Sequence, residues 1–504
     1  MKLYSSGFLA LVAAMASLAE ASPAQHVFQP HLGGLTSHVP SRLMASAREP
    51  TASLLSDAKW SKVETMAALP NYQLRIKQPH LCAANTTQYS GYLDTDDDKH
   101  FFFWFFEARN APRDDAPVIL WMNGGPGCSS FTGLLMELGP CRVDKGGKSA
   151  SDHVYGWNDK AHVIFIDQPL NVGYSYGKDV FNSIAAGKDV YNFLQLFYHS
   201  FPEYASSELH VFGESYGGHY VPATAKAIHE ANLEFTSKQA LGALSVAEKE
   251  KRVLPLTSIG VGNGLTDPLT QYRYYGKMAC NSTYPPVLRQ DQCESMDSKY
   301  PTCARLIEAC YKWQNSLACY PAEMYCNSMM VAYQQSGANP YDVRIPCEGG
   351  NLCYPIMSDI DAFLNDPAVQ QELGSDVSKF ESCSQKVYSG FILNGDWMKP
   401  YHREVPPLLE AGIRVLIYAG DADWICNWYG NKAWSEALEW SGKSGFQGEK
   451  DNDWVVDGKA AGEARTHKNF SFLRVFGAGH MVPYDQPENS LDMINRWIAN
   501  KPFY

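Results

Sequence analysis

Three features are missing from this 504-residue chain, and each absence excludes a class of protein. Basic residues are not in excess: 42 Lys and Arg stand against 54 Asp and Glu, and the net charge of −12 disfavours nucleic acid as a partner. After the first 21 residues no apolar run is long enough to cross a bilayer, so no membrane association is expected. The 13 cysteines form no paired C-x-x-C motifs, which argues against a zinc site.

The N-terminal residues that are present have the pattern of a secretory signal peptide. A lysine precedes an apolar centre at residues 7–18, and small residues follow, with cleavage expected after Ala21. Residues 22–75 are polar and irregular, with one weakly helical patch at residues 52–69. We predict that this stretch is a removable pro-segment, and a disordered tail is the alternative. The expected destination is the secretory pathway, ending in a vacuolar lumen or outside the cell.

The cysteines and the N-glycosylation sequons are consistent with passage through the oxidising secretory pathway. Eight of the 13 cysteines lie between Cys280 and Cys353, a density typical of disulfides, and the odd total leaves at least one free thiol. Three sequons, at Asn85, Asn281 and Asn469, are candidate glycan acceptors on exposed loops.

From residue 76 to residue 504 the pattern predicts one catalytic domain of the α/β class. Residues 88–93 and 101–107 read as an antiparallel hairpin, and six further apolar, β-rich runs lack a two-residue alternation, as buried parallel strands do. Helical segments separate several of them, which predicts a mostly parallel sheet with helices on both faces. Residues 266–389 interrupt this rhythm and hold most of the cysteines. We interpret them as an insertion that caps the C-terminal edge of the sheet.

Residues 209–221, LHVFGESYGGHYV, contain the most informative turn. An apolar strand breaks at Gly213-Glu214-Ser215-Tyr216-Gly217 and a helix follows, which is the arrangement of a nucleophile elbow. The flanking glycines fit a turn with little room for a Cβ on either side. By itself the pentapeptide is weak evidence, because an ordinary turn has the same composition.

Other strand ends supply chemical partners for Ser215. WMNGGPGCSS at residues 121–130 places backbone N–H groups where no side chain blocks approach, as an oxyanion hole requires. AGDADWICNW offers Asp421 and Asp423, and GAGHMVPYDQP offers His480. The order Ser, Asp, His is that of α/β-hydrolases, and each residue follows a strand, hence lies at one sheet edge. These observations leave the choice between the two aspartates open.

Four motifs, WMNGGPGCSS, GESYGGHY, YAGDADWICNW and GAGHMVPYDQPENS, together resemble those of the serine carboxypeptidases, and the similarity extends from about residue 88 to residue 497. The resemblance implies an α/β-hydrolase fold. It implies Ser215 as the nucleophile, His480 as general base and then acid, and Asp423 as the residue that orients the imidazole. It assigns the oxyanion hole to the N–H groups of Gly125 and Tyr216.

The resemblance also implies a binding site for the substrate's terminal carboxylate, formed by Asn123, Gly124, Glu137 and Glu214. Two neighbouring carboxyls repel each other when both are ionised, so one pKa rises and the pair can hold a proton and donate hydrogen bonds to an anion. Acidic pH is then expected to favour activity on peptides. The implied substrate pocket has six members, each of which core packing would explain equally well: Thr132, Leu265, Tyr341, Tyr354, Met357 and Met481.

The resemblance further implies a set of disulfides, with Cys426 left as the free thiol. The implied pairs are Cys128–Cys383, Cys280–Cys293, Cys303–Cys326, Cys310–Cys319 and Cys347–Cys353. Cys82 and Cys141 have no counterparts in that pattern, and we expect them to pair with each other because both flank the early sheet. The chain departs from the family at Gly217, where Ala is usual, and in its short pro-segment, which leaves vacuolar sorting open.

The predicted function is that of a serine carboxypeptidase, which releases C-terminal amino acids from peptides and proteins through an acyl-enzyme intermediate. No cofactor or metal is implied, and the protein is expected to be a monomer. A carboxypeptidase-like acyltransferase or esterase is the alternative enzyme class. A secreted binding protein on an inactive hydrolase scaffold is the non-enzymatic alternative, and the presence of Ser215, Asp423 and His480 counts against it.

Overall fold

The computed structural model describes residues 59–82, 85–348 and 351–504. The predicted signal peptide and the predicted pro-segment up to residue 58 lie outside the described residues. In the part of the chain that the structure describes, no helix is long and apolar enough to span a membrane.

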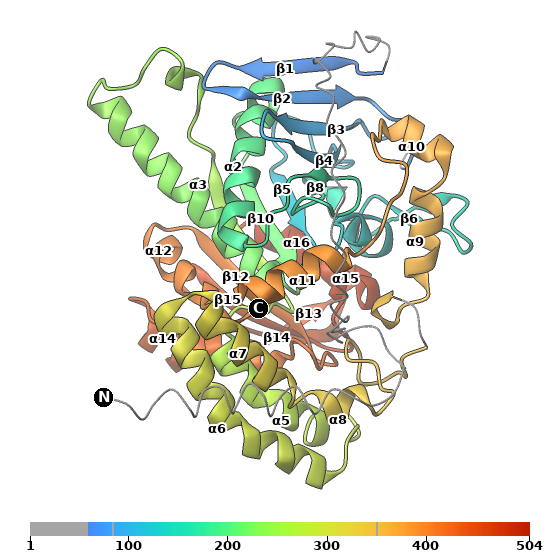
Figure 1. The fold of residues 1–504 in the computed structure, drawn as a ribbon, viewed down its shortest axis with the longest axis vertical. Coiled ribbons are helices and arrows are strands. Elements are labelled where there is room, and N and C mark those ends of the chain that lie inside the picture. Colours follow the sequence, from blue (N-terminus) through green and yellow to red (C-terminus); the bar gives the residue numbers. More distant parts are fainter. Residues whose placement is uncertain (1–58, 83–84, 349–350) are drawn as a thin grey trace, which may run out of the picture. The chain divides into compact units, whose positions relative to one another are not determined.

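A 13-stranded mixed sheet organises the described residues (Figure 1). Six neighbouring strands at its centre are parallel, in the order β8, β5, β10, β11, β12, β15. Nearly all their residues are buried on both faces, which explains why the sequence shows no alternation. Their bounds are β5 Val118–Met122, β8 His162–Ile166, β10 Leu209–Glu214, β11 Leu256–Gly262, β12 Arg414–Gly420 and β15 Phe470–Val475. The predicted α/β-hydrolase class is confirmed.

Antiparallel strands flank this centre on both sides. The hairpin of β3 (Gln88–Thr95) and β4 (Lys99–Phe106) joins β8 on one side, as the sequence predicts. β14 (Lys459–His467) and β13 (Asn452–Val456) extend the sheet beyond β15 on the other. Short strands complete the inventory: β6 Cys141–Val143, β7 Ala150–Asp152 and β9 Tyr176–Gly177.

The sheet begins earlier in the chain than the sequence predicts. β1 (Lys62–Met66) and β2 (Leu69–Lys77) pair with each other, and β2 pairs with β3. The helix expected at residues 52–69 is therefore wrong over residues 62–69, and residues 62–75 belong to the sheet although they were assigned to the pro-segment. The physical reason is burial: Leu74 and Ile76 point into the core at a spacing of two and are 0% and 2% exposed.

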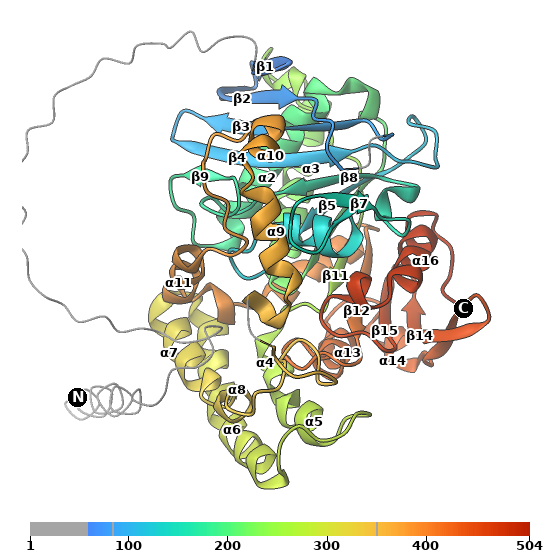
Figure 2. The same ribbon diagram turned by 90° about the vertical axis from the view of Figure 1, so that its right-hand side faces the viewer.

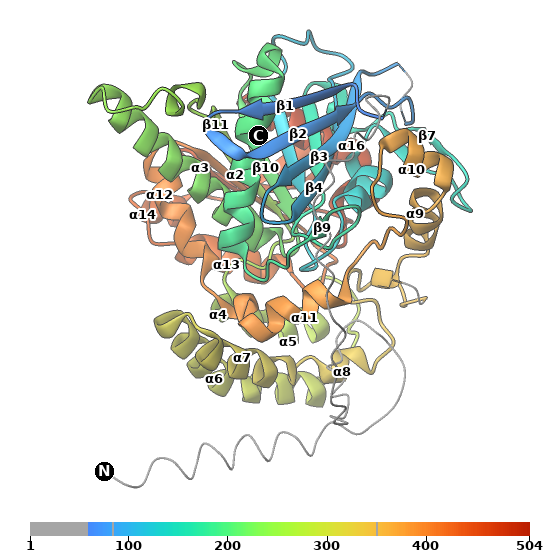
Figure 3. The ribbon, with the colours of Figure 1, turned by 45° about the horizontal axis from the view of Figure 1, so that its top comes forward.

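Helices cover both faces of the sheet (Figures 1 and 3). α2 (Ser183–Ser200) and α3 (Gly217–Ala240) pack together over one face. α16 (Pro487–Ile498) lies against the other, where the Trp497 indole donates a 2.9 Å hydrogen bond to Ser258 of β11. Three further helices pack against strands of the sheet: α12 Val405–Glu410, α13 Trp428–Ala437 and α14 Lys443–Gly448. The short helix α15 (Val482–Asp485) packs against α16.

Between β11 and β12 the chain forms a helical region, which we call the cap. Its helices are α4 Pro268–Gln271, α5 Tyr275–Cys280, α6 Gln290–Trp313, α7 Ser316–Asn327, α8 Val331–Gln334, α9 Ile356–Leu364, α10 Pro367–Leu373 and α11 Gln385–Asn394. α6 and α7 form an antiparallel pair far from β1 and β2 (Figure 2). α10 lies beside β3, where Leu373 accepts a hydrogen bond from Ser90, and α9 packs against β6.

Six disulfides join these parts. Three of them link α5, α6 and α7: Cys280–Cys293, Cys303–Cys326 and Cys310–Cys319. Two others are Cys128–Cys383, which ties the cap to the segment after β5, and Cys347–Cys353. These five are the pairs that the resemblance implies. The sixth, Cys82–Cys141, is the pair expected from their places beside the early sheet, and Cys426 is free and buried.

The junction of β10 and α3 places Ser215 in a constrained turn. Ser215 has a φ of 63°, in the left-handed region that few non-glycine residues adopt. Of the two flanking glycines, only Gly213 is sterically required: a Cβ there would lie 2.6 Å from the Met122 carbonyl oxygen. At Gly217 a Cβ would lie 3.4 Å from the same oxygen, an ordinary contact. The expectation that both glycines lack room is therefore wrong for Gly217, which explains why alanine is usual there.

The three sequons differ in their surroundings. Asn85 and Asn281 are exposed. Asn469 is half-buried, and its side-chain amide donates to the carbonyl oxygens of Leu409 and Ile413, both at 2.9 Å. A glycan on this nitrogen would displace hydrogen bonds that hold the β14–β15 turn to the end of α12. The expectation of an exposed acceptor is therefore wrong for Asn469.

We predict that Asn281 is glycosylated and Asn469 is not when the protein is made in a secretory host. Enzymatic deglycosylation in heavy-oxygen water, followed by peptide mass spectrometry, marks each formerly glycosylated asparagine. Labelled Asp at position 469 at an occupancy similar to that at position 281 would contradict the prediction.

We also predict that Gly217→Ala stabilises the protein by about 0.4–1 kcal/mol, because the side chain fits and the unfolded chain loses freedom. Gly213→Ala is the matched control, since the same added methyl group meets a backbone carbonyl and is expected to destabilise by about 1–3 kcal/mol. Urea or thermal unfolding measures both. Equal destabilisation by the two substitutions would refute this reading of the turn.

Candidate active site

Ser215 lies at the C-terminal edge of the parallel strands, and its backbone is held on both sides. Its N–H donates to the Gly262 carbonyl at the end of β11, at 3.0 Å. Its carbonyl oxygen accepts from the N–H groups of Gly218 and Leu265, both at 2.9 Å. These three hydrogen bonds compensate for the unfavourable φ and leave the side chain facing a pocket.

His480 and Asp423 meet at the same edge. The Nδ1 atom of His480 lies 2.7 Å from Oδ2 of Asp423, and both side chains are buried. Asp423 also accepts hydrogen bonds from the Asn263 amide at 2.8 Å and from the N–H groups of Ile425 and Cys426 at 3.1 and 3.2 Å. These donors fix the carboxylate, which in turn fixes the imidazole and directs its Nε2 atom toward the pocket that Ser215 also lines.

Asp421 performs a different task, which resolves the choice that the sequence left open. It accepts hydrogen bonds from the Tyr284 hydroxyl at 2.6 Å and from the Gly477 N–H at 3.0 Å, and it pairs with Arg474 at 3.3 Å. It therefore anchors the loop that leads to His480, whereas Asp423 contacts the imidazole itself.

A strap of the cap, residues 338–346, holds the histidine loop from the other side. The His480 N–H donates to the Tyr341 carbonyl at 2.8 Å. Arg344 donates to the Gly477 carbonyl at 2.6 Å and pairs with Asp342 and Asp485. The imidazole is thus fixed by β12, by its own loop and by the cap.

The glycine-rich segment after β5 lies directly against the turn that carries Ser215. A Cβ on Gly124 would lie 2.3 Å from the backbone nitrogen of Tyr216 and 2.8 Å from the Ser215 Cβ. Gly125 has a φ of 110°, which an L side chain rarely adopts. Glycine at these two positions therefore allows the backbone to approach the Ser215–Tyr216 peptide, as an oxyanion hole requires.

Glu137 and Glu214 form a buried carboxyl pair beside Ser215. Glu137 is 0% and Glu214 is 2% exposed, and their carboxyls hydrogen-bond to each other. Burial raises the pKa of Glu214 well above its ordinary value, and Glu137 raises it further; burial also raises the pKa of Glu137. One oxygen of each carboxyl has no donor among the described residues. A proton shared between the two carboxyls would allow one of them to donate the hydrogen bond that joins them and would remove the repulsion between two buried negative charges.

Asn123 joins the carboxyl pair to the glycine-rich segment. Its amide nitrogen donates to Glu137 at 3.3 Å. Its amide oxygen accepts from the Trp121 indole at 2.7 Å and from the Gly133 N–H at 3.0 Å, which determines the orientation of the amide.

These groups border one pocket, which together with the solvent at its open mouth occupies about 370 Å³. Of the predicted pocket residues, Thr132, Tyr341 and Met481 line it, whereas Leu265, Tyr354 and Met357 are buried but are not among its lining. The full lining is Asn123, Gly124, Gly125, Cys128, Thr132, Glu214, Ser215, Tyr341, Leu352, His480 and Met481.

Sequence reasoning missed two residues of this site, Leu352 and Asn263. Leu352 lines the pocket from the small Cys347–Cys353 disulfide loop, and no pattern distinguishes it from other apolar residues. Asn263, which orients Asp423, follows β11 directly. A polar residue at the end of a parallel strand was the signal that could have found it.

The site also brings a thiol close to the imidazole. Asp423, Cys426 and His480 each offer one ligand atom within 4.8 Å of the others. A metal ion there would have to compete with the hydrogen bond between Asp423 and His480. Burial raises the pKa of the Cys426 thiol well above its ordinary value, so it remains protonated and a poor ligand. The geometry therefore favours a hydrogen-bonded catalytic group over a metal site.

Comparison with known proteins agrees with this geometry. The family model described as serine carboxypeptidase matches residues 78–500. The chain is 52% identical to carboxypeptidase Y of Candida albicans over 441 residues, covering 86% of this chain and 78% of the relative. It is 48% identical to carboxypeptidase Y of Saccharomyces cerevisiae over 453 residues, covering 87% and 81%.

Among solved structures, the chain resembles Kex1, a prohormone-processing carboxypeptidase from Saccharomyces cerevisiae, with a TM-score of 0.70 and 26% identity over 82% of this chain and 91% of that one. The family match and the structural match therefore agree. The chain belongs to the serine carboxypeptidase family and is a serine-type carboxypeptidase, a hydrolase of peptide bonds.

Proposed function

We propose that this carboxypeptidase works through an acyl-enzyme in which Ser215 is the nucleophile. Ser215 Oγ attacks the carbonyl carbon of the last peptide bond while His480 Nε2 accepts its proton. His480 then returns that proton to the leaving amine as the C–N bond breaks, which releases the C-terminal amino acid. Water, deprotonated by His480, then attacks the ester carbonyl. The bond to Ser215 Oγ breaks, His480 returns the proton to Oγ, and the shortened peptide is released. The buried hydrogen bond of 2.7 Å from His480 to Asp423 supports these roles.

The N–H groups of Gly125 and Tyr216 are the proposed donors to the oxygen that becomes negative in each tetrahedral intermediate. The close approach of Gly124 to the Tyr216 nitrogen supports this assignment, because it brings the two peptide groups together. One such donor is typically worth about 3–4 kcal/mol of transition-state stabilisation.

The buried pair of Glu137 and Glu214 is the observation that carries the proposed preference for free C-termini. With a proton shared between them, the pair and the Asn123 amide can donate hydrogen bonds to the substrate's terminal carboxylate, with Gly124 beside them. An ester or acyl-transfer substrate has no such carboxylate. This site therefore favours the peptidase over the acyltransferase or esterase alternative.

The pH dependence follows from the direction of the pKa shift. Because the pKa of Glu214 is raised, its protonated form persists to higher pH than that of an ordinary glutamic acid. Binding of a peptide carboxylate is then fully present below the raised pKa and is lost as the pH rises through it, when both carboxyls become anionic and repel the substrate. We propose a preference for acidic pH on this ground.

We also propose that the protein passes through the secretory pathway, because disulfides form and persist in oxidising compartments and six are present. Any removed pro-segment has to end before Lys62 if β1 is to keep its place in the sheet. A monomer remains the proposed state.

We expect a fluorophosphonate probe to label the wild-type protein at Ser215 and not to label Ser215→Ala. The same preparation should release the last residue from blocked dipeptides with a free C-terminus much faster than it cleaves their C-terminal amides. Labelling of Ser215→Ala would refute the nucleophile, and cleavage of esters without release from free acids would favour the esterase.

We expect Glu137→Gln to lower kcat/KM for free-acid peptides by about 10–100-fold at acidic pH, because a charge-assisted hydrogen bond to the substrate is lost. Ester substrates should change by less than about twofold, and the decline of peptide activity with pH should flatten. Glu230→Gln, at an exposed site of α3, is the control for the change of net charge. An unchanged pH profile for peptides in Glu137→Gln would show that the pair does not share a functional proton.

A further inference from the structure

Behind the active site, the side chain of Tyr216 is anchored at its far end. Its hydroxyl donates a 2.9 Å hydrogen bond to Asp396 Oδ2, and the two side chains are 1% and 0% exposed. The ring stacks on His219 at a centroid distance of 4.3 Å and lies 5.4 Å from the Trp397 ring. Tyr216 directly follows Ser215, so these contacts act on the same peptide unit that carries a proposed oxyanion donor.

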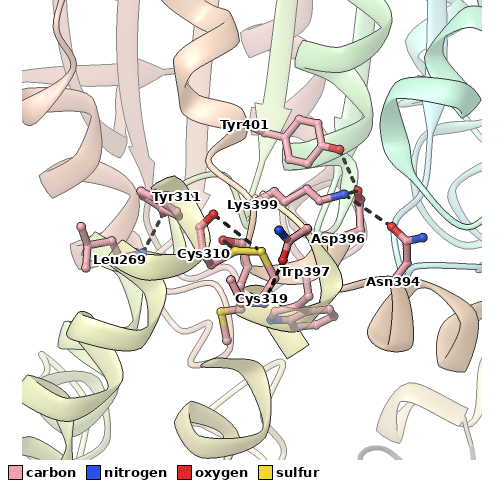
Figure 4. The surroundings of a disulfide bond; sticks show 12 residues. Leu269, Cys310, Tyr311, Cys319, Asn394, Asp396, Trp397, Lys399 and Tyr401 are labelled. Atoms are coloured by element: carbon pink, nitrogen blue, oxygen red, sulfur yellow. Dashed lines mark hydrogen bonds and ion pairs between the residues drawn. A yellow bond between two sulfur atoms is a disulfide. The ribbon is translucent and has the colours of Figure 1, made fainter. Parts of the chain in front are cut away.

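Asp396 collects donors from several distant parts of the chain. Its Oδ2 atom accepts from the Ser183 hydroxyl at 2.6 Å in addition to Tyr216. Its Oδ1 atom accepts from the Tyr401 hydroxyl at 2.8 Å and from Lys399 at 3.1 Å. Figure 4 shows the Tyr401 hydroxyl and the Lys399 amine meeting at Asp396, close to the Cys310–Cys319 disulfide of the cap. The carboxyl thus joins the start of α2 and the segment that follows the cap to the turn after β10.

Both phenols remain donors to this carboxyl. Burial raises the pKa of Tyr216 well above its ordinary value and Asp396 raises it further, and the same two causes raise the pKa of Tyr401. Lys399 supplies a positive charge next to the buried Asp396. Breaking one of these hydrogen bonds costs free energy, because it leaves a buried acceptor without its partner. This cost favours the one geometry in which all the donors reach Asp396.

The direction of the Tyr216 N–H depends on the orientation of the Ser215–Tyr216 peptide plane. The Ser215 carbonyl oxygen lies in this plane and accepts hydrogen bonds from Gly218 and Leu265, which orient the plane from the Ser215 side. The anchored side chain of Tyr216 adds a second restraint, because it holds the residue at the other end of the same peptide plane. Such restraint matters because catalysis is sensitive to misplacement of a group by about 1 Å.

We propose that Asp396 is a positioning residue, which holds the Tyr216 hydroxyl and thereby keeps the Tyr216 N–H directed at the oxygen of the tetrahedral intermediate. Asp396 does not touch the substrate. Its effect falls on the transition state, where the oxygen is charged, and leaves binding of the ground state unchanged. This inference rests on the proposed function of Ser215 and the oxyanion hole.

Tyr216→Phe tests the proposal, because it removes the hydrogen bond and keeps the ring. We expect kcat for a free-acid peptide to fall about tenfold, with KM within about twofold of the wild type. The pH profile should keep its shape, since neither member of the Glu137–Glu214 pair is altered. Asp396→Asn is the second variant, and combining it with Tyr216→Phe should lower kcat little further than either alone.

Tyr401→Phe is the matched control, because it removes a hydrogen bond of the same kind from the other oxygen of Asp396 and leaves Tyr216 untouched. We expect its kcat to stay within about twofold of the wild type. Unfolding midpoints of all variants separate stability from catalysis. Equal falls of kcat in Tyr216→Phe and Tyr401→Phe, or a change in KM alone, would overturn the proposal. Failure of the wild type to react with the fluorophosphonate probe would instead refute the proposed function.

Discussion

The backbone of Ser215 is the constraint on which the rest of the site depends. The residue adopts a left-handed conformation between β10 and α3, and β11 and the segment after it fix its N–H and its carbonyl oxygen. The parallel sheet supplies these partners, because its strand ends lie side by side at one edge. His480 and Asp423 arrive at that edge from β15 and β12 for the same reason. The site is therefore a property of the sheet, and the cap closes it.

Several buried carboxyl groups lie near this edge of the sheet, and they differ in the hydrogen-bond donors that contact them. Asp423 and Asp396 are each held by several donors, which fixes their geometry. Glu137 and Glu214 have few donors besides each other, so burial and mutual repulsion favour a shared proton. In the proposed mechanism, one pair of acids presents hydrogen bonds to an anion, while the other two orient a base and a backbone turn.

Disulfides and the strap at residues 338–346 give the cap its fixed relation to the sheet. Cys128–Cys383 connects the glycine-rich segment to the part of the cap before α11, and Arg344 connects the strap to the loop of His480. Covalent links limit the number of arrangements open to a large insertion of this kind. The result is a pocket whose walls come from both parts, including Tyr341 and Leu352.

The sequence by itself determined the fold class, and it predicted the turn at Ser215 and the chain order of the proposed triad, because strands buried on both faces and the glycines at their ends leave local patterns. It also indicated Glu137 and Glu214, although only through a family resemblance. The choice of Asp423 over Asp421 also came from that resemblance, and only the tertiary structure gives its physical reason, since the two differ in what they contact. The tertiary structure also placed residues 62–75 in the sheet, made Asn469 a structural residue and left Gly217 with room for a methyl group. Those outcomes depend on contacts between residues far apart in the chain, and no local spacing records them.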